Sequence, residues 1–164
     1  MPRLRAALGS LVFLVLMPGV VGGLLPWALT GWQPRSPAPG LPVAGWLLVG
    51  AGVTVLLHAV GRFVLEGIGT PAPVAPTERL VVGGLYRYVR NPMYIAVAAV
   101  IVGQALILAR PGLLVYAALF GAIVAAFVRA YEEPTLAARY GEQYERYRRA
   151  VPAWWPRRRP WDGG

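Results

Sequence analysis

Three groups of polar residues interrupt an otherwise apolar sequence, and the first lies at the end of an apolar run. His58, Arg62 and Glu66 are spaced four residues apart, so a helix would place them on one face. Ionisable side chains at membrane depth are costly and usually face a bundle interior or a wet cavity, where they can bind a polar ligand. The same spacing also suits Arg62 and Glu66 reaching back to the membrane surface while His58 bonds a neighbouring helix. The spacing alone leaves both interpretations open.

The second group is the segment 83–94, which reads GGLYRYVRNPMY. Pro92 favours the first turn of a helix, and Asn91 is then the expected N-cap. A helix start is a natural site for a carboxylate or a phosphate, and Arg87 and Arg90 add positive charge beside it. The segment is equally consistent with a basic loop that fixes the orientation of the chain in a membrane.

The third group is the pair Glu132 and Glu133, which follows the last apolar run. Adjacent carboxylates repel each other and are difficult to bury unless a cation pairs with them. They are also well placed as solvated acids at the start of a helix. Together, the three groups suit a ligand that has both an anionic and a cationic part, and they do not identify it.

Composition indicates the kind of scaffold that must position these residues. The 164 residues suffice for one domain, in which 57% are hydrophobic and 14% are charged, against about 25% charged in soluble domains. A bilayer-spanning helix needs about 20 mostly apolar residues. The sequence therefore predicts an all-α integral membrane protein with about four transmembrane helices, at residues 8–29, 41–65, 93–109 and 112–130. An amphipathic C-terminal helix is predicted at 134–150, with tyrosines on one face and charged residues on the other.

The arginines predict the orientation of these helices. The chain has a net charge of +9 and no lysine, and its arginine-rich segments alternate along the sequence with arginine-poor ones. By the positive-inside rule both termini are cytoplasmic, as is the C-terminal helix, and we expect a bacterial or archaeal inner membrane. The charge lies at the ends of apolar runs, which predicts membrane lipids as partners and no nucleic acid. With no cysteine and one histidine, disulfides, thiolate sites and multi-histidine metal sites are excluded, and we expect no metal.

Residues 60–156 contain a set of motifs in a fixed order that resembles the isoprenylcysteine carboxyl methyltransferase family, including its bacterial and archaeal members and the related phospholipid methyltransferases. The matching residues are Gly69-Thr70-Pro71, Pro73, Pro76, Leu80-Val81, Gly84-Leu85-Tyr86-Arg87-Tyr88-Val89-Arg90-Asn91-Pro92-Met93-Tyr94, Glu132-Glu133, Leu136, Tyr140-Gly141, Tyr144, Tyr147 and Val151-Pro152. The resemblance implies a single membrane domain over 1–164, with two transmembrane helices in 1–65 and the cofactor-binding, catalytic part in 66–156.

The resemblance also implies a membrane methyltransferase that uses S-adenosylmethionine and needs no protein nucleophile. Arg87, Arg90 and Asn91 would hold the carboxylate end of the cofactor, and Glu132 or Glu133 would pair with its amino group or ribose. The full expected cofactor site is Tyr86, Arg87, Arg90, Asn91, Pro92, Tyr94, Glu132, Glu133, Leu136 and Tyr140. The expected catalytic residues are Arg62, Glu66, Arg90 and Glu133, with Arg62 and His58 orienting the acceptor.

One position departs from the family pattern, and the substrate stays open. Asn91 stands where the eukaryotic members have histidine, and an amide cannot act as a base near neutral pH. The acceptor is expected to be a lipid, an isoprenoid carboxylate or another small molecule that reaches the membrane. Two alternatives remain: an NADPH-dependent membrane reductase of lipid-like substrates and a non-enzymatic membrane scaffold.

Overall fold

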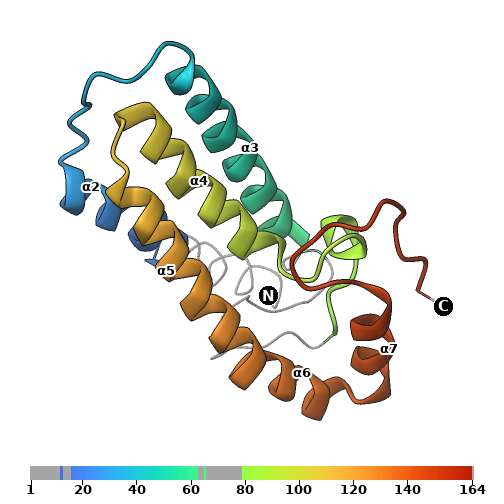
Figure 1. Cartoon of the computed structure of the whole chain (residues 1–164). Coiled ribbons are helices and arrows are strands. Elements are labelled where there is room, and N and C mark those ends of the chain that lie inside the picture. Colours follow the sequence, from blue (N-terminus) through green and yellow to red (C-terminus); the bar gives the residue numbers. More distant parts are fainter. Residues whose placement is uncertain (1–11, 13–15, 63–64, 66–78, 164) are drawn as a thin grey trace.

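The computed structural model describes residues 12, 16–62, 65 and 79–163, and every regular element among them is helical (Figure 1). Four apolar segments form the body of the molecule. They are the π-helical turn η1 (Val20–Leu24) leading into α2 (Leu25–Thr30), then α3 (Leu41–Arg62), α4 (Pro92–Leu108) and α5 (Gly112–Phe127). Polar elements follow or intervene: η3 (Gly84–Arg87), η4 (Val128–Glu132), α6 (Glu133–Tyr140) and α7 (Glu142–Ala150). The prediction of an all-helical chain is confirmed for the described residues.

Helices α3 and α4 form the tightest contact of the bundle, and glycines make it possible. A Cβ atom built on Gly45 would lie 2.6 Å from the carbonyl oxygen of Gly103, and one on Gly103 would lie 2.7 Å from that of Gly45. Two turns further along α3, a Cβ on Gly52 would lie 2.7 Å from the carbonyl oxygen of Ala96. The small residues repeat every seven positions on both helices and in opposite directions, so the two backbones run antiparallel in direct contact.

A kink in the first described helix is stabilised by side chains of α4 and α5. Pro26 has no N–H, so the carbonyl of Gly22 loses its α-helical donor, and the preceding turn widens to a π-turn in which Leu25 N–H bonds the Val20 carbonyl. Gln104 Nε2 donates to Gly22 O at 2.6 Å, and Tyr116 Oη donates to Val21 O at 2.8 Å. These two bonds satisfy the backbone carbonyls that the kink exposes and fix this helix against α4 and α5.

Helix α5 continues without a break through η4 into α6, and this long helix leads to the polar end of the molecule (Figure 1). A second π-turn, η4, again ends two residues before a proline, Pro134. The predicted helix at 134–150 is in fact two helices, because Gly141 adopts φ 53° and ψ −129°, a conformation that ends α6 and turns the chain into α7. The amphipathic character holds, but the break lets α7 fold back beside α6.

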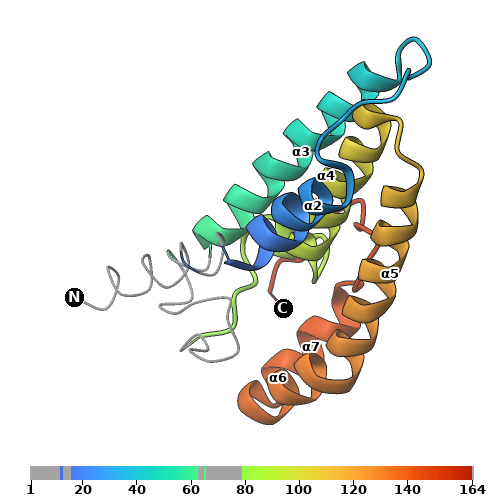
Figure 2. The same cartoon turned by 90° about the vertical axis from the view of Figure 1, so that its left-hand side faces the viewer.

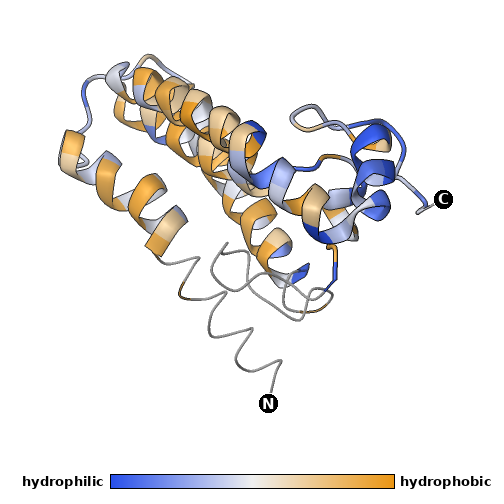
Figure 3. Ribbon diagram, turned by 90° about the horizontal axis from the view of Figure 1, so that it is seen from below, coloured by the Kyte–Doolittle hydropathy of each residue, from blue (hydrophilic) through white to orange (hydrophobic). Residues whose placement is uncertain are grey.

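Two of the described helices are long and apolar enough to cross a bilayer, Leu41–Arg62 and Gly112–Tyr140, while Leu16–Thr30 and Pro92–Leu108 are shorter apolar helices. Large apolar side chains face outward on the long helices, with Leu47 70% and Ile123 68% exposed. Figure 3 shows the apolar residues along the helical body and the hydrophilic residues gathered in α6, α7 and the C-terminal segment. An outer surface of this kind is stable in lipid and not in water.

The C-terminal segment packs back on the loop that precedes α4. Tyr144, Tyr147 and Val151 are at most 3% exposed and form a small core with Leu80, Val82, Leu136, Tyr140 and Trp161. Backbone hydrogen bonds join the two segments: Arg90 N–H to Pro152 O, Arg157 N–H to Tyr88 O, and Trp161 N–H to Arg87 O. The C-terminal segment thereby fixes the position of the loop that carries Arg90 and Asn91 (Figure 2).

Candidate active site

Arg90 is the most heavily bonded side chain at the start of α4. Its Nη1 donates to Glu133 Oε1 at 2.5 Å and to Tyr144 Oη at 3.0 Å, and its Nε donates to Val151 O at 3.0 Å. The side chains of Arg90 and Glu133 are only 11% and 16% exposed. A buried ion pair is tolerated when further hydrogen bonds support it, and Tyr144 and the carbonyl of Val151 supply two such bonds to Arg90. Arg90 is therefore held rigidly, with its Nη2 group making no bond to the described residues.

Asn91 occupies the N-cap position of α4, as the sequence predicts, but its side chain caps nothing. The Nδ2 group instead donates to Ala153 O at 3.2 Å, and the residue is 7% exposed. The difference arises because the C-terminal segment passes directly beside the helix start and offers a carbonyl acceptor. Asn91 thus ties this segment to the wall of the cavity described below.

Glu132 points to the same side of the long helix as Phe127, and the π-turn is the reason. Five residues of α-helix would place the two side chains about 140° apart. In η4 the hydrogen bonds span five residues, with Glu133 N–H bonding Val128 O, so Glu132 falls roughly one turn below Phe127. Tyr94 Oη donates to Glu132 Oε2 at 3.0 Å. Adjacent residues of a helix point about 100° apart, so Glu133 lies on another face, where it bonds Arg90.

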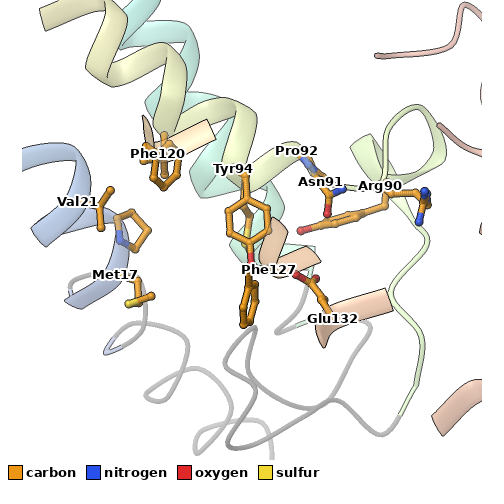
Figure 4. A pocket seen from close by; sticks show the side chains of 13 residues that line it. Met17, Val21, Arg90, Asn91, Pro92, Tyr94, Phe120, Phe127 and Glu132 are labelled. Carbon is orange, nitrogen blue, oxygen red and sulfur yellow. Dashed lines mark hydrogen bonds between the residues drawn. The ribbon is translucent and has the colours of Figure 1, made fainter. Parts of the chain in front are cut away.

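These side chains line a cavity of about 140 Å³ between α4, α5 and the first described helix (Figure 4). One end is polar and is formed by Tyr86, Arg90, Asn91, Tyr94 and Glu132. The rest is apolar and is lined by Met17, Pro18, Val21, Pro92, Met93, Val97, Phe120 and Phe127. The cavity can therefore accept a charged group at one end and a hydrocarbon group at the other.

Six of the ten expected cofactor residues line this cavity: Tyr86, Arg90, Asn91, Pro92, Tyr94 and Glu132. Four lie elsewhere. Glu133 holds Arg90 from outside the cavity, and Leu136 and Tyr140 pack in the C-terminal core. Arg87 turns away and bonds the C-terminal segment, through Nε to Trp161 O at 2.7 Å and through Nη2 to Asp162 Oδ1 at 2.5 Å.

The expected acceptor-orienting residues lie beside the loop rather than in the cavity. A Cβ atom on Gly84 would lie 2.6 Å from His58 Nε2 and 2.9 Å from Arg62 Nε, and Gly84 has φ 58°. The turn η3 therefore sits directly on these two side chains of α3, which needs a glycine for both space and backbone conformation. Tertiary folding thus brings the first polar group of the sequence next to the second. Glu66 lies outside the described residues.

Several lining residues have no signal in the sequence. Met17, Val21, Phe120 and Phe127 lie inside long apolar runs, where nothing separates a cavity residue from a lipid-facing one. Only the packing of the first described helix against α4 and α5 selects them. Asp162, the partner of Arg87, lies beyond the segment in which motifs were recognised.

Burial favours the protonated form of the tyrosines in the small core of Tyr144, Tyr147 and Val151. It raises the pKa of Tyr147, whose hydroxyl donates to Tyr86 O at 2.7 Å, and it also raises the pKa of Tyr144. Burial is likewise the main reason that the pKa of Tyr86 is raised. The neutral phenol of Tyr147 donates to the loop, and that of Tyr144 accepts from Arg90, so both hold the loop and the C-terminal segment together. Neutral phenols of this kind are poor candidates for general bases.

The fold and the site together define a membrane protein with a charged group and an apolar cavity at one end of a helical bundle. The family model for phospholipid methyltransferases matches residues 42–143, more than half of the chain. The chain belongs to this family, which also contains the isoprenylcysteine carboxyl methyltransferase-like membrane enzymes, and the resemblance found in the sequence is confirmed. No curated protein and no solved structure matches the chain.

Family membership supports a membrane methyltransferase in general. The matched region contains the polar end of the cavity, from Tyr86 to Glu132, and the close contact between α3 and α4 at Gly45, Gly52 and Gly103. Met17 and Val21 precede the matched region, and the C-terminal segment from Tyr144 onward follows it.

Proposed function

We propose that this protein transfers a methyl group from S-adenosylmethionine to a lipid-like acceptor in the cavity between α4, α5 and the first described helix. The observation that carries the proposal is the two-part lining of that cavity. S-Adenosylmethionine presents a carboxylate, an ammonium group and a cationic sulfur, whereas a lipid-like acceptor presents a hydrocarbon chain. The polar and apolar ends therefore suit the two reactants of one reaction.

The polar residues offer a complementary group for each charge of the cofactor. The carboxylate of Glu132, bonded to Tyr94, suits the ammonium or the sulfonium. Arg90 is the cationic residue of this lining and suits the carboxylate, with its guanidinium also bonded to Glu133, Tyr144 and Val151. A volume of about 140 Å³ is below the roughly 300–1,000 Å³ of sites that enclose a drug-sized ligand. The cavity thus fits the reacting end of the donor together with the head of the acceptor.

The chemistry required of the protein is alignment and exclusion of water. The bound cofactor supplies a methyl group that is already activated, so no protein nucleophile is needed. The apolar walls keep water from the reacting atoms, and Asn91 and Tyr86 limit the space at the polar end. A carboxylate acceptor needs no base; for an amine acceptor, Glu132 is the lining residue that can take the proton.

The membrane arrangement that we propose has four spanning helices and both termini in the cytoplasm of a bacterial or archaeal cell, with the protein in the inner membrane. The shorter apolar helices Leu16–Thr30 and Pro92–Leu108 contact the longer ones. Most of the described arginines lie at the polar end of the bundle, with Arg35 and Arg110 in the turns at the other end. The cavity is lined from both predicted parts of the chain, 1–65 and 66–156, which favours one membrane domain.

The test is calorimetric binding of S-adenosylhomocysteine to detergent-purified protein. Glu132→Gln removes the carboxylate of the cavity and should weaken binding about tenfold or more, since hydrogen bonds to charged groups contribute about 1.5–3 kcal/mol. Glu142→Gln is the matched control, because it removes one carboxylate from the exposed N-terminus of α7. The control should bind as the wild type does.

Transfer of labelled methyl groups to membrane lipids and to prenylated carboxylates would then identify the acceptor. Well-folded wild-type protein that binds no S-adenosylhomocysteine would overturn the proposal. If Glu132→Gln and Glu142→Gln weaken the binding of S-adenosylhomocysteine equally, this cavity is not the cofactor site.

A further inference from the structure

A second cavity of about 560 Å³ lies outside the proposed reaction site, on another face of the long helix α5–η4–α6. Its polar lining consists of Arg90, Arg129, Arg148 and Glu133, and Trp154 and Val128 are among its apolar lining residues. The lining residues come from α5, η4, α6, α7, the C-terminal segment and the loop before α4. Figure 1 shows α7 folded back beside α6. Arg90 is the one described residue that lines both cavities.

The lining carries more positive than negative charge. Three guanidinium groups face one carboxylate, that of Glu133, whose Oε1 is bonded to Arg90 and whose Oε2 lies 3.8 Å from Arg148 Nε. Arg148 also has Glu145 at 3.6 Å, outside the lining. The side chain of Arg129 makes no ion pair or hydrogen bond with the described residues. The cavity therefore attracts an anion, and Arg129 and Arg148 have donors to offer it.

The position of the cavity indicates which anion. Arg129 lies two residues beyond the end of α5, whose exposed Leu119 and Ile123 form part of the lipid-facing surface. Trp154 lies at the same level, and tryptophan is common where a bilayer meets water. Phosphates of lipid headgroups occupy this level, and arginine binds phosphate oxygens through two parallel N–H groups.

We propose that this cavity binds the phosphate group of an anionic phospholipid, with Arg129 and Arg148 as its main ligands and the lipid chains along α5. Glu133 pairs with Arg90 and so neutralises one of the three guanidinium charges of the lining. The lipid would be a bound partner and not the methyl acceptor, because Glu132 and Tyr94 face the other cavity. Soluble inorganic phosphate offers the same oxygen acceptors, so the experiment must distinguish it from the lipid headgroup.

Native mass spectrometry of the detergent-purified full chain tests this proposal. The protein is released from micelles that contain phosphatidylglycerol or, separately, phosphatidylcholine. Arg129→Gln and Arg148→Gln should each lower the retained phosphatidylglycerol about five- to tenfold, which corresponds to the loss of one charge-assisted contact. Arg146→Gln is the matched control, because it removes the same charge from the exposed side of α7.

Selective retention of phosphatidylglycerol by the wild type and the control, and its loss from both cavity variants, would support the proposal. If millimolar inorganic phosphate then displaces the lipid, the phosphate site stands and also takes the soluble anion. Equal retention by all variants, or equal retention of phosphatidylcholine, would overturn it. Displacement of the lipid by S-adenosylhomocysteine would also overturn it, since the cavity would then belong to the cofactor; this result is distinct from a failure of cofactor binding.

Discussion

Replacing Glu133 by glutamine should destabilise the protein, whereas the same change at the adjacent Glu132 should not. Glu133 accepts from Arg90 at 2.5 Å in a site where the two side chains are 11% and 16% exposed. Among the described residues, Glu132 accepts a hydrogen bond from the hydroxyl of Tyr94 and from no cation. The sequence treats the two carboxylates as equivalent, so a difference between the two variants tests the structure directly.

The magnitude follows from what remains in the variant. Breaking a buried ion pair costs about 3–5 kcal/mol when the surviving charge has no partner. Here Arg90 keeps Tyr144 and the carbonyl of Val151, and the glutamine oxygen can still accept a hydrogen bond from it. We therefore expect a loss of about 2 kcal/mol, which corresponds to about 4–8 °C in melting temperature for a chain of this size.

Intrinsic tryptophan fluorescence during heating in detergent measures this difference, since the chain contains six tryptophans. Glu133→Gln should melt several degrees below the wild type. Glu132→Gln should melt within about 1–2 °C of it, because the glutamine oxygen can keep the hydrogen bond from Tyr94 and no ion pair is broken. A Glu132 variant that melts as low as the Glu133 variant would refute the assignment of Arg90 to Glu133 alone.

Three further predictions follow. Tyr94→Phe removes the hydrogen bond to Glu132 and should lower kcat/KM for methyl transfer about five- to tenfold with the melting temperature nearly unchanged; an unaltered rate would exclude the pair from the reaction. Gly103→Ala should destabilise the chain, because its Cβ would lie 2.7 Å from the backbone of α3, whereas Gly121→Ala, with no atom within 4 Å of its Cβ, should be neutral or stabilising in the same melting experiment. Burial raises the pKa of Tyr147 above its ordinary value near 10, so its contribution to stability is complete below pH 10 and is lost as the pH rises further; Tyr147→Phe should weaken the alkaline fall in melting temperature, and an equally steep fall in the variant would contradict this.

The parts of the fold that could be predicted from the sequence depend on local signals. Four apolar runs predict the helical segments, and α3 and α5 begin at the predicted residues, while α4 begins one residue earlier at Pro92. Pro111 and Gly112 predict the turn between α4 and α5, which forms around Ala109 in a left-handed conformation. These features follow from hydropathy and backbone preference, which act within a few residues of the chain.

The break at Gly141 could not be predicted in the same way. The periodicity of 134–150 runs through the glycine without interruption, and an isolated glycine is tolerated in helices. The turn forms because folding α7 back places Tyr144 and Tyr147 in a core with Leu80 and Trp161. That gain comes from residues that lie about sixty positions before Gly141 and about twenty positions after it, so no short window along the sequence contains it.

By itself, the sequence determined the helical membrane scaffold, the family and the residue types at the polar end of the cavity, because composition and short motifs carry that information. Only the tertiary structure decided which face of each helix those residues occupy. The π-turn before Pro134 places Glu132 on the cavity side, with Glu133 on the face that meets Arg90. Val21, in the π-turn before Pro26, lines the apolar end. A single extra residue in a turn rotates every later side chain by about 100°, and whether a helix accommodates a proline in this way depends on the contacts that stabilise the wider turn.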